Sequence, residues 1–566
     1  MKKNLWMLLL SVAVLYVLPM LFRPLLSSAE FRYAEIAREM LEQKDFVSPK
    51  LLGLRYFDAM PMSSWLTAAN IFLFGANNFS LRLLSLLSVL GTAALLFLWC
   101  KNHLRSLETS ITAAFLYLGG SAVCFLGTFA GPEAFFSFCC TAAWVCFFQG
   151  IESGTFRNRA LLLLCSGVAA GCGFLTGGIP AFVLFFPAML LYLVWNKDWR
   201  HLYHLLLPLL AALLFIAPWA VAVHKAEPDF WYCYAAYKNT LPSTQTALRL
   251  LPLFLLAGLF PALPVVLTGI TGTAPESWKE TFSSSEFRFS FGLLLVSLII
   301  PVYPSANTTA HFLVIFVPAA LIGALLLDKV PAEKAQTRLH QLTVGNAVIF
   351  MIIGTLALLA GLFYLLWGTG FIPALPLKIA VWAPFMTTLA LGLVISGTLF
   401  FIHRKEKFPE PAAFFSLYAV AIFIAVCFMP GYTASHRMPE YELLSIASDL
   451  SGEEMRRPRI ITTAELMYPA AWCFKDSTVQ VLGTPGAMAY GHNYAVAHGE
   501  RPFALTGNEF STLLKDPGRQ ESIFFIICKN DSEKLALDLP QGKVFTTTGD
   551  LCGFYFPAPE QQKGKK

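Results

Sequence analysis

The sequence predicts an all-α multi-pass membrane bundle followed by an α/β domain at the C-terminal end, and three observations lead to this prediction. Of the 566 residues, 56% are hydrophobic and only 13% are charged, whereas a soluble globular chain is about 25% charged. Uncharged apolar runs long enough to cross a bilayer recur along the first 430 residues. Beyond that point the composition becomes that of an ordinary soluble domain.

The apolar runs define the expected membrane helices. A helix needs about 20 apolar residues to cross the hydrocarbon core, and by this measure we expect about 13 transmembrane helices. The first run follows Lys2 and Lys3 without a convincing cleavage site, so we expect it to remain as both signal and first helix. The runs begin near residues 5, 83, 108, 134, 160, 179, 203, 250, 289, 309, 344, 374 and 411.

The distribution of Lys and Arg between the runs predicts the orientation of the chain. Basic residues cluster in alternate loops, such as the loop with Lys101 and Arg105, whereas the opposite loops near 128–133 and 303–309 contain none. Because cytoplasmic loops carry the basic excess, we expect a cytoplasmic N-terminus and an external C-terminal domain. The net charge of +6 is spread over these short clusters, so binding to nucleic acid is not expected.

Two external segments are long. Residues 23–80 form the first external loop. We expect a membrane domain over 1–430, an external α/β domain over 431–560 and a disordered tail over 561–566. In the α/β domain, the expected strands are IITTAEL, STVQVLG, SIFFIIC and FYFPAP, and the expected helices are LSIASDLSG and EFSTLLKD.

Within the first external loop, residues 30–43 fit an amphipathic helix. Its apolar side carries Phe31, Ala34, Ile36, Met40 and Leu41, and its charged side carries Glu35, Arg38, Glu39 and Glu42. Two interpretations are open for this helix: it lies flat on the membrane surface, or its charged side is only a solvated face.

The cysteines give little evidence of a metal or redox site. Nine of the 12 lie in or beside apolar runs, where cysteine is most often a small buried hydrophobic residue. Cys473, Cys528 and Cys552 fall in the external domain, and one disulfide among them is compatible with an oxidising compartment, but the spacing does not select a pair. We expect no metal and no cofactor, and the sequence gives no support for a divalent cation.

Three blocks of the first external loop carry a resemblance to a known family. FRYAEIAREM, DFVSPKLLGLRYFD and LFGANNFSLRLL follow, in order and spacing, the loop of the bacterial aminoarabinose (lipid A) transferases. KAEPDFWYCY after the seventh run and GAMAYGHNY in the external domain are also similar to that family. The resemblance covers most of the chain. It implies a GT-C-like fold in the bacterial inner membrane and polyprenyl-phosphate-sugar-dependent glycosyl transfer, as in the related protein O-mannosyltransferases.

The resemblance also implies a set of acids that orient or deprotonate the acceptor. The family's loop begins with an Asp-Glu pair, which is Ala29-Glu30 here, so only Glu30 keeps its place. Glu35 matches the second acid of the loop, Asp58 keeps an acid of the family's Tyr-Phe-Glu-Lys-Pro, and Glu133 replaces an Asp of the second external loop. The implied catalytic residues are therefore Glu30, Glu35, Asp58 and Glu133.

The substrate-binding residues implied in the same way are Arg32, Tyr33, Arg55, Tyr56 and His311. Arg55 is the best candidate cation for the leaving phosphate, and its alternative role is an anchor to lipid headgroups. The chain departs from the family at Ala29, where an Asp is expected, and at Ala59, Gly177 and Ala306, where Lys residues are expected.

Three functions are compatible with these residues. The first is a glycosyltransferase that moves a sugar from a polyprenyl-phosphate donor to a lipid A-like glycolipid, a protein or a glycan at the outer membrane face. The second is a catalytically degenerate member of the same fold that binds lipid, acts as a scaffold or regulates. The third is a transporter of lipid-linked substrates, although spans almost free of ionisable residues argue against a proton-coupled pump. The expected partners are the lipid-linked donor and membrane lipids. The sugar, the acceptor and the oligomeric state are open.

Overall fold

The computed structural model describes residues lying mainly within 25–240, 263–299, 312–330, 458–528, 543–546 and 551–559. The chain divides into two compact units. The first unit comprises residues 1–23, 60–66 and 77–429, and the second comprises 24–59, 67–76 and 430–566. Most of residues 23–80, the predicted first external loop, therefore belongs to the same compact unit as the C-terminal segment.

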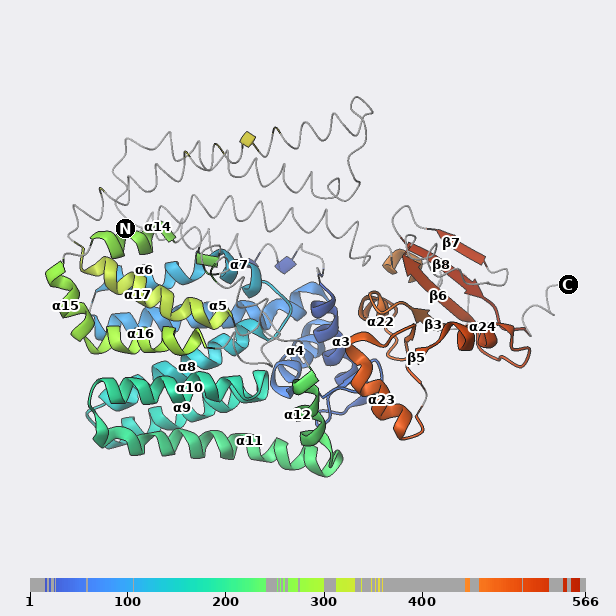
Figure 1. Ribbon diagram of the computed structural model, residues 1–566, viewed down its shortest axis with the longest axis horizontal. Coiled ribbons are helices and arrows are strands. Elements are labelled where there is room, and N and C mark those ends of the chain that lie inside the picture. The colour runs from blue at the N-terminus through green and yellow to red at the C-terminus, as the bar shows by residue number, and fades with distance from the viewer. Residues whose placement is uncertain are drawn as a thin grey trace. The chain divides into compact units, whose positions relative to one another are not determined.

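The first unit is a bundle of apolar helices that run alongside one another (Figure 1). In the part of the chain that the structure describes, four helices are long and apolar enough to cross a membrane: α5, α8, α9 and the continuous η2–α11. The α6–α7 pair, bent by 62°, makes a fifth such span if it is taken as one helix. The bounds are α5 Asn78–His103, α6 Leu107–Leu118, α7 Ser121–Gly127, α8 Glu133–Glu152, α9 Phe156–Gly177, α10 Pro180–Trp195, η2 Trp199–Leu205, α11 Leu206–Ala226, α12 Phe230–Thr240, α14 Leu263–Gly272, α15 Pro275–Ser283, α16 Ser285–Ser297, η5 Leu313–Ile315 and α17 Phe316–Asp328.

The expected spans agree with these helices wherever the structure describes them. The long helices or the bent pair account for the runs that begin near 83, 108, 134, 160 and 203. The shorter apolar helices α10, α16 and α17 account for those near 179, 289 and 309. The total of about 13 spans stays a prediction, because the starts near 5, 250, 344, 374 and 411 lie outside the described residues.

Small residues let the helices of the bundle approach closely. A Cβ added at Gly167 of α9 would lie 2.4 Å from the carbonyl oxygen of Pro208 in α11. On another side of α9, the Ser166 hydroxyl donates to the Ala143 carbonyl of α8 at 2.7 Å. Backbone approach at small residues and bonds from serine to a neighbouring helix are typical of packing inside a membrane, where lipid is as apolar as leucine.

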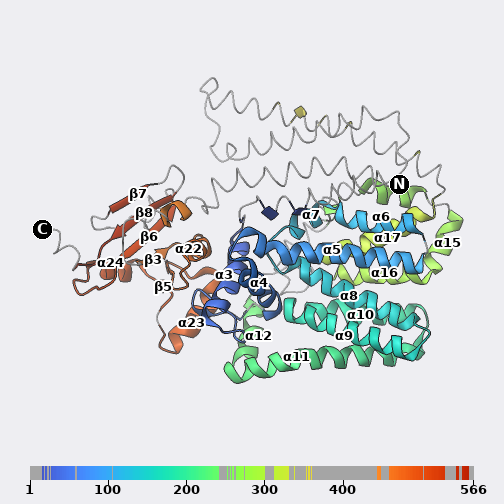
Figure 2. The same cartoon turned by 180° about the vertical axis from the view of Figure 1, so that it is seen from behind.

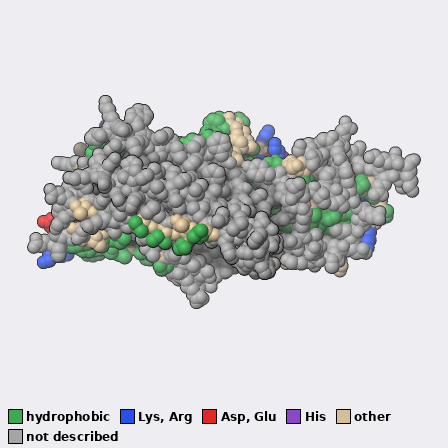
Figure 3. All heavy atoms as spheres, turned by 90° about the horizontal axis from the view of Figure 1, so that it is seen from above, with side chains coloured by type: hydrophobic (Ala, Val, Ile, Leu, Met, Phe, Trp, Pro, Cys, Tyr) green, Lys and Arg blue, Asp and Glu red, His purple; other side chains and the backbone are tan. Residues whose placement is uncertain are grey.

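Large apolar side chains also point away from the bundle. Leu87, Leu161 and Leu214 are 59%, 59% and 74% exposed. On the face drawn in Figure 3, most of the coloured side chains are hydrophobic and few are basic. Such exposure would be costly over this extent in water and is the expected surface of helices solvated by lipid.

The second unit contains a six-stranded sheet with the order β5-β4-β3-β6-β8-β7. Neighbouring strands are parallel from β5 to β6, and β8 and β7 add antiparallel pairs at one edge. Helices α22, α23 and α24 connect the parallel strands in turn, which is the arrangement that parallel neighbours require. The bounds are β3 Arg459–Thr462, α22 Met467–Phe474, β4 Gln480–Leu482, α23 Ala489–Ala497, β5 Ala504–Leu505, α24 Gly507–Lys515, β6 Ile523–Cys528, β7 Lys543–Thr546 and β8 Leu551–Phe556.

The α/β prediction for this segment is confirmed for most of its elements. The four expected strands overlap β3, β4, β6 and β8, although β8 begins three residues before FYFPAP, and the expected helix EFSTLLKD corresponds to α24. Of the expected helix LSIASDLSG, residues 444–447 are helical and the rest lies outside the described residues. The short strand β5, the edge strand β7 and the helices α22 and α23 were not predicted. Two-residue β5 offers no periodic pattern to detect, and α22 carries Pro469.

The cysteines of the second unit do not form a pair. Among the described cysteines the structure contains no disulfide. Cys528 lies opposite Leu551, and Cys552 lies opposite Ile527. Directly opposed residues share a face of an antiparallel sheet and neighbours along a strand do not, so Cys528 and Cys552 point to opposite faces. Cys473 is buried in α22.

The predicted first external loop contains α3 Ser28–Gln43, β1 Lys50–Leu51, β2 Leu54–Arg55 and α4 Pro61–Phe74. The helix predicted over 30–43 is confirmed. Ser27 is the N-cap of this helix, because its hydroxyl accepts a hydrogen bond from the Glu30 amide at 3.2 Å. Helix α22 of the C-terminal segment packs against α3, as the views in Figures 1 and 2 both show.

Candidate functional site

Helix α3 buries three of its glutamates. Glu30 and Glu35 are 0% exposed and Glu39 is 1% exposed. The interpretation of Glu35 and Glu39 as part of a solvated face is therefore wrong. Helical periodicity placed them opposite the apolar side chains. Within the second unit, however, the side of α3 that carries them is covered by α22 and by the hairpin that β1 and β2 form as an antiparallel pair.

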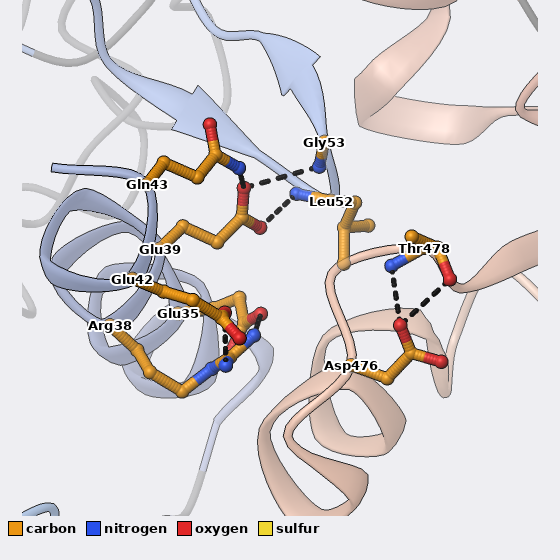
Figure 4. A network of polar contacts seen from close by, with 9 residues as sticks. All are labelled: Glu35, Arg38, Glu39, Glu42, Gln43, Leu52, Gly53, Asp476 and Thr478. Carbon is orange, nitrogen blue, oxygen red and sulfur yellow. Dashed lines mark hydrogen bonds and ion pairs between the residues drawn. The ribbon is translucent and has the colours of Figure 1, made fainter. Parts of the chain in front are cut away.

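Arg38 holds Glu35 through a two-pronged ion pair (Figure 4). The Arg38 Nε and Nη2 atoms donate to the two Glu35 carboxylate oxygens at 2.8 and 2.5 Å. The third guanidinium nitrogen donates to the exposed Glu42 at 2.7 Å. Burial raises the pKa of Glu35 above its ordinary value, and the Arg38 charge opposes that rise. Both oxygens of Glu35 are thus engaged within its own helix.

Glu39 fixes the turn between β1 and β2. Its carboxylate accepts from the Leu52 amide at 2.5 Å and from the Gly53 amide at 3.1 Å, and the Gln43 side chain donates to it at 3.3 Å (Figure 4). Leu52 and Gly53 have φ of 56° and 72°, so both central residues of this two-residue turn are left-handed. A leucine in that conformation costs about 1–2 kcal/mol, which the bonds to a carboxylate offset.

The environment of Glu39 predicts a dependence of stability on pH. Burial and the nearby Glu35 carboxylate raise the pKa of Glu39 to about 8, against the lowering effect of the two amides. A raised carboxyl pKa means that the folded state holds the proton more tightly than the unfolded chain does, so stability falls as pH rises from about 4.5 to about 8. We expect a Glu39→Gln variant to flatten this slope. Thermal unfolding of both proteins across this pH range measures it, and parallel slopes would contradict the prediction.

Arg55 ends the hairpin and contacts the C-terminal segment inside the second unit. Its guanidinium lies 3.2 Å from the Glu500 carboxylate and 5.1 Å from the ring centre of Tyr494. The next residue, Tyr56, is 5% exposed, and its amide donates to the Pro49 carbonyl at 2.9 Å. The residue predicted to be the main cation for a leaving phosphate is thus already paired with an anion.

The first turns of α3 place the other loop candidates together. Glu30 lies beside Ala29 at the start of the helix. Arg32 donates through Nη2 to the Tyr33 hydroxyl at 3.3 Å, and its guanidinium lies 5.0 Å from the centre of that ring. Arg32 and Tyr33 are both partly exposed. This end of α3 therefore carries a buried acid and a partly accessible cation within three positions of each other.

Glu133 belongs to the first unit, where it begins α8 and is 3% exposed. A Cβ added at Gly131 would meet the Glu133 carboxylate at 2.1 Å, so a side chain at position 131 would displace this carboxylate. The Ser85 hydroxyl donates to the Phe129 carbonyl at 2.7 Å and fixes the same loop. Arg82, one turn before Ser85, is fully buried. Sequence reasoning missed Arg82 because it lies at the border between the loop and the α5 run.

Helix α9 ends at Gly177, where the family resemblance led us to expect a lysine, and Gly178 follows in the turn to α10. Gly178 has φ of 75°, and a Cβ there would lie 2.3 Å from the Tyr234 hydroxyl. Tyr234, from the KAEPDFWYCY block, is 7% exposed. The hydroxyl of a tyrosine thus lies at this turn of the first unit, an arrangement that the sequence did not indicate.

The remaining predicted residues, Asp58 and His311, lie outside the described residues, as do Ala59 and Ala306. The structure therefore groups Glu30, Glu35, Arg32, Tyr33, Arg55 and Tyr56 in the second unit and places Glu133 in the first. Across the described part of the chain, no cluster of His, Cys, Asp and Glu is arranged to hold a metal ion.

A family model matches the N-terminal part of the chain, and named relatives match nearly its whole length. A family model described as dolichyl-phosphate-mannose-protein mannosyltransferase matches residues 3–234. A protein from Edwardsiella ictaluri named undecaprenyl phosphate-alpha-4-amino-4-deoxy-L-arabinose arabinosyl transferase is 26% identical, with 92% of this chain and 93% of the relative covered. A protein of the same name from Serratia proteamaculans is 25% identical, with 98% and 99% covered.

Solved structures give the fold. The crystal structure of ArnT from Cupriavidus metallidurans bound to undecaprenyl phosphate matches with a TM-score of 0.78 at 15% identity and covers 98% of each chain. The apo structure of the same protein matches with a TM-score of 0.79 at 16% identity over the same shares. The predicted architecture, a multi-pass membrane bundle with a C-terminal domain, is therefore confirmed.

Proposed function

We propose that this protein, an aminoarabinose transferase-like member of the GT-C membrane proteins, moves a sugar from a polyprenyl-phosphate donor to an acceptor at the outer face of the inner membrane. The observation that carries the proposal is the agreement in fold over nearly the whole chain with a protein crystallised with undecaprenyl phosphate. The related proteins named as arabinosyl transferases support the same reaction class. A lipid A-like glycolipid is the first acceptor to test, and a protein or a glycan follows.

The two ends of the chain are proposed to lie on opposite sides of the membrane. The alternation of basic and neutral loops supports a cytoplasmic N-terminus and an external second unit. In this proposed orientation, α3 and the sheet lie on the side where a lipid-linked sugar is used. Protease added to intact spheroplasts should then remove a C-terminal tag, and a tag that is cleaved only after lysis would contradict this orientation.

Within the site, Glu30 is proposed as the acid that orients or deprotonates the acceptor. It keeps the place of a family acid, and its burial shields the carboxylate from water. Arg32 and Tyr33 are the proposed contacts of the donor phosphate, because both are partly exposed on the same turn. Tyr56, Asp58, Glu133 and His311 also remain proposed as functional residues.

Glu35 and Arg55 receive different roles in this proposal. Both oxygens of Glu35 accept bonds from Arg38, so Glu35 fixes α3 rather than meeting the acceptor. The Arg55 charge is balanced by Glu500, so Arg55 holds the hairpin rather than the leaving phosphate. Glu35 and Arg55 thus affect the reaction indirectly, Glu35 by fixing α3 and Arg55 by holding the hairpin.

The competing function is a catalytically degenerate member of the same fold that binds the lipid donor without turning it over. Ala29, Ala59, Gly177 and Ala306 favour it, since they stand where the resemblance implies an acid or a cation. The test is the protein purified, reconstituted in vesicles and supplied with an undecaprenyl-phosphate pentose and lipid A. The proposal predicts a sugar added to lipid A, detected by mass spectrometry. Binding of the donor with no added sugar on any acceptor would favour the degenerate member.

A further inference from the structure

We propose that α22 and α23 of the C-terminal segment are the docking surface for the β1–β2 hairpin of the first external loop. In this role the external domain holds the hairpin, and Gly491, Tyr494 and Glu500 are positioning residues. This inference deepens the proposed glycosyl transfer. Its activity measurement rests on that proposed function, whereas its hydrogen-exchange measurement does not. Every contact that carries it lies within the second unit.

The first contact is between backbones. A Cβ added at Gly491 in α23 would lie 2.9 Å from the Arg55 carbonyl oxygen and 3.6 Å from the Leu54 Cβ. Any side chain at position 491 would therefore push α23 away from β2. This gives a physical reason for the glycine in the block GAMAYGHNY, which the sequence alone did not explain.

The second contact is between aromatic rings at the end of the hairpin. Phe57 is 4% exposed and meets the rings of Tyr490 and Tyr494 edge-on, with centres 5.7 and 5.4 Å away. Tyr494 also lies against the Arg55 guanidinium, which pairs with Glu500. Edge-on ring pairs and a cation over a ring face are both stabilising contacts. The residues Arg55 and Phe57 thus dock on one side chain, Tyr494.

The third contact is at the opposite end of the hairpin. The Gly53 Cα lies close to the chain that follows α22, where an added Cβ would be 3.3 Å from the Ser477 carbonyl oxygen. Glu39 holds the same turn from α3, and α3 itself packs against α22. The hairpin is therefore held at its turn and at its exit, and two separated contacts fix both its position and its direction.

Gly491→Ala in the full chain tests this docking, with hydrogen exchange as a readout that does not require activity. We expect amides in the peptide covering residues 50–57 to exchange about tenfold faster or more, because the hairpin opens locally from α23. Peptides from β3 and β6 should keep their protection, which shows that the sheet is folded. The matched control is Gly518→Ala, an exposed glycine of the same unit whose added Cβ meets only the Asp516 side chain at 3.4 Å.

A second pair of variants distinguishes loss of the Tyr494 ring contact from a general loss of folding. Tyr494→Leu keeps an apolar side chain and removes the ring, and it is expected to raise exchange in the hairpin. Tyr494→Phe keeps the ring and is expected to behave like the natural protein. Unchanged hairpin exchange in both Gly491→Ala and Tyr494→Leu would overturn the docking surface.

The activity readout tests the positioning role. Displacing the hairpin is expected to lower kcat by about tenfold to a hundredfold, because small misplacements near reacting groups have large effects on rate. The KM for the undecaprenyl-phosphate donor should change by less than about twofold. Faster exchange with an unchanged kcat would overturn the positioning role and leave docking intact. If the natural protein transfers no sugar, the proposed function fails, and hydrogen exchange still decides whether the hairpin docks.

Discussion

Replacing Glu30 with glutamine is expected to lower the rate of sugar transfer by about 10²- to 10⁴-fold, the usual contribution of a positioned acid or base. Glutamine has nearly the same shape but cannot accept the acceptor's proton. The Ala29 side chain beside it offers no substitute. The rate is measured as sugar added to lipid A per protein, with donor and acceptor at saturating concentrations.

Two further variants serve as controls for the Glu30→Gln result. Glu465→Gln changes an exposed acid of the same unit and should transfer sugar at the natural rate. Glu30→Asp keeps the charge but shortens the side chain, and an intermediate rate is expected. If Glu30→Gln proves poorly folded, the Glu30→Asp rate still tests the assignment. Full activity in a folded Glu30→Gln protein would exclude Glu30 as the acid.

The largest expected effect on stability is that of Arg38→Met, about 3–5 kcal/mol in the second unit. The substitution keeps a long apolar side chain but leaves the Glu35 carboxylate buried without its bidentate partner. Glu35 can then take up a proton, so the loss should be smaller at pH 5 than at pH 8. Thermal unfolding at the two pH values, together with hydrogen exchange of α3 peptides, measures the change.

The matched control is Lys50→Met, which breaks a pair between partly exposed side chains, Lys50 and Asp45, 3.2 Å apart. A pair of that kind contributes only about 0–1 kcal/mol. Adding Glu35→Gln to Arg38→Met should recover part of the stability, because it removes the buried charge. Equal losses from Arg38→Met and Lys50→Met would contradict the stabilising role of the buried Glu35–Arg38 pair in α3.

The sequence was most informative where structure depends on short stretches of chain. A run of apolar residues long enough to cross a membrane specifies a helix by itself, which is why the starts near 83, 134 and 160 agree with α5, α8 and α9. Strands rich in branched and aromatic residues, such as SIFFIIC, were also recognisable as β6.

The site was less predictable because its partners are far apart along the chain. The buried Glu39 accepts its hydrogen bonds from amides 13 and 14 residues later in the chain. Arg55 pairs with Glu500, which lies 445 residues later in the chain. Helical periodicity describes only one element at a time, so it placed Glu35 and Glu39 on the charged side of the helix, either at the membrane surface or in solvent. The family resemblance supplied the reaction class and the loop, but not the contacts that hold the loop.

The most direct test of the central claim is release of undecaprenyl phosphate from an undecaprenyl-phosphate pentose by the purified protein in vesicles that contain lipid A. We predict that the lipid phosphate appears in step with glycosylated lipid A, and that Glu30→Gln suppresses both signals. A folded natural protein that binds the donor but releases no lipid phosphate with lipid A, protein or glycan acceptors would contradict the assignment of this chain as a transferase.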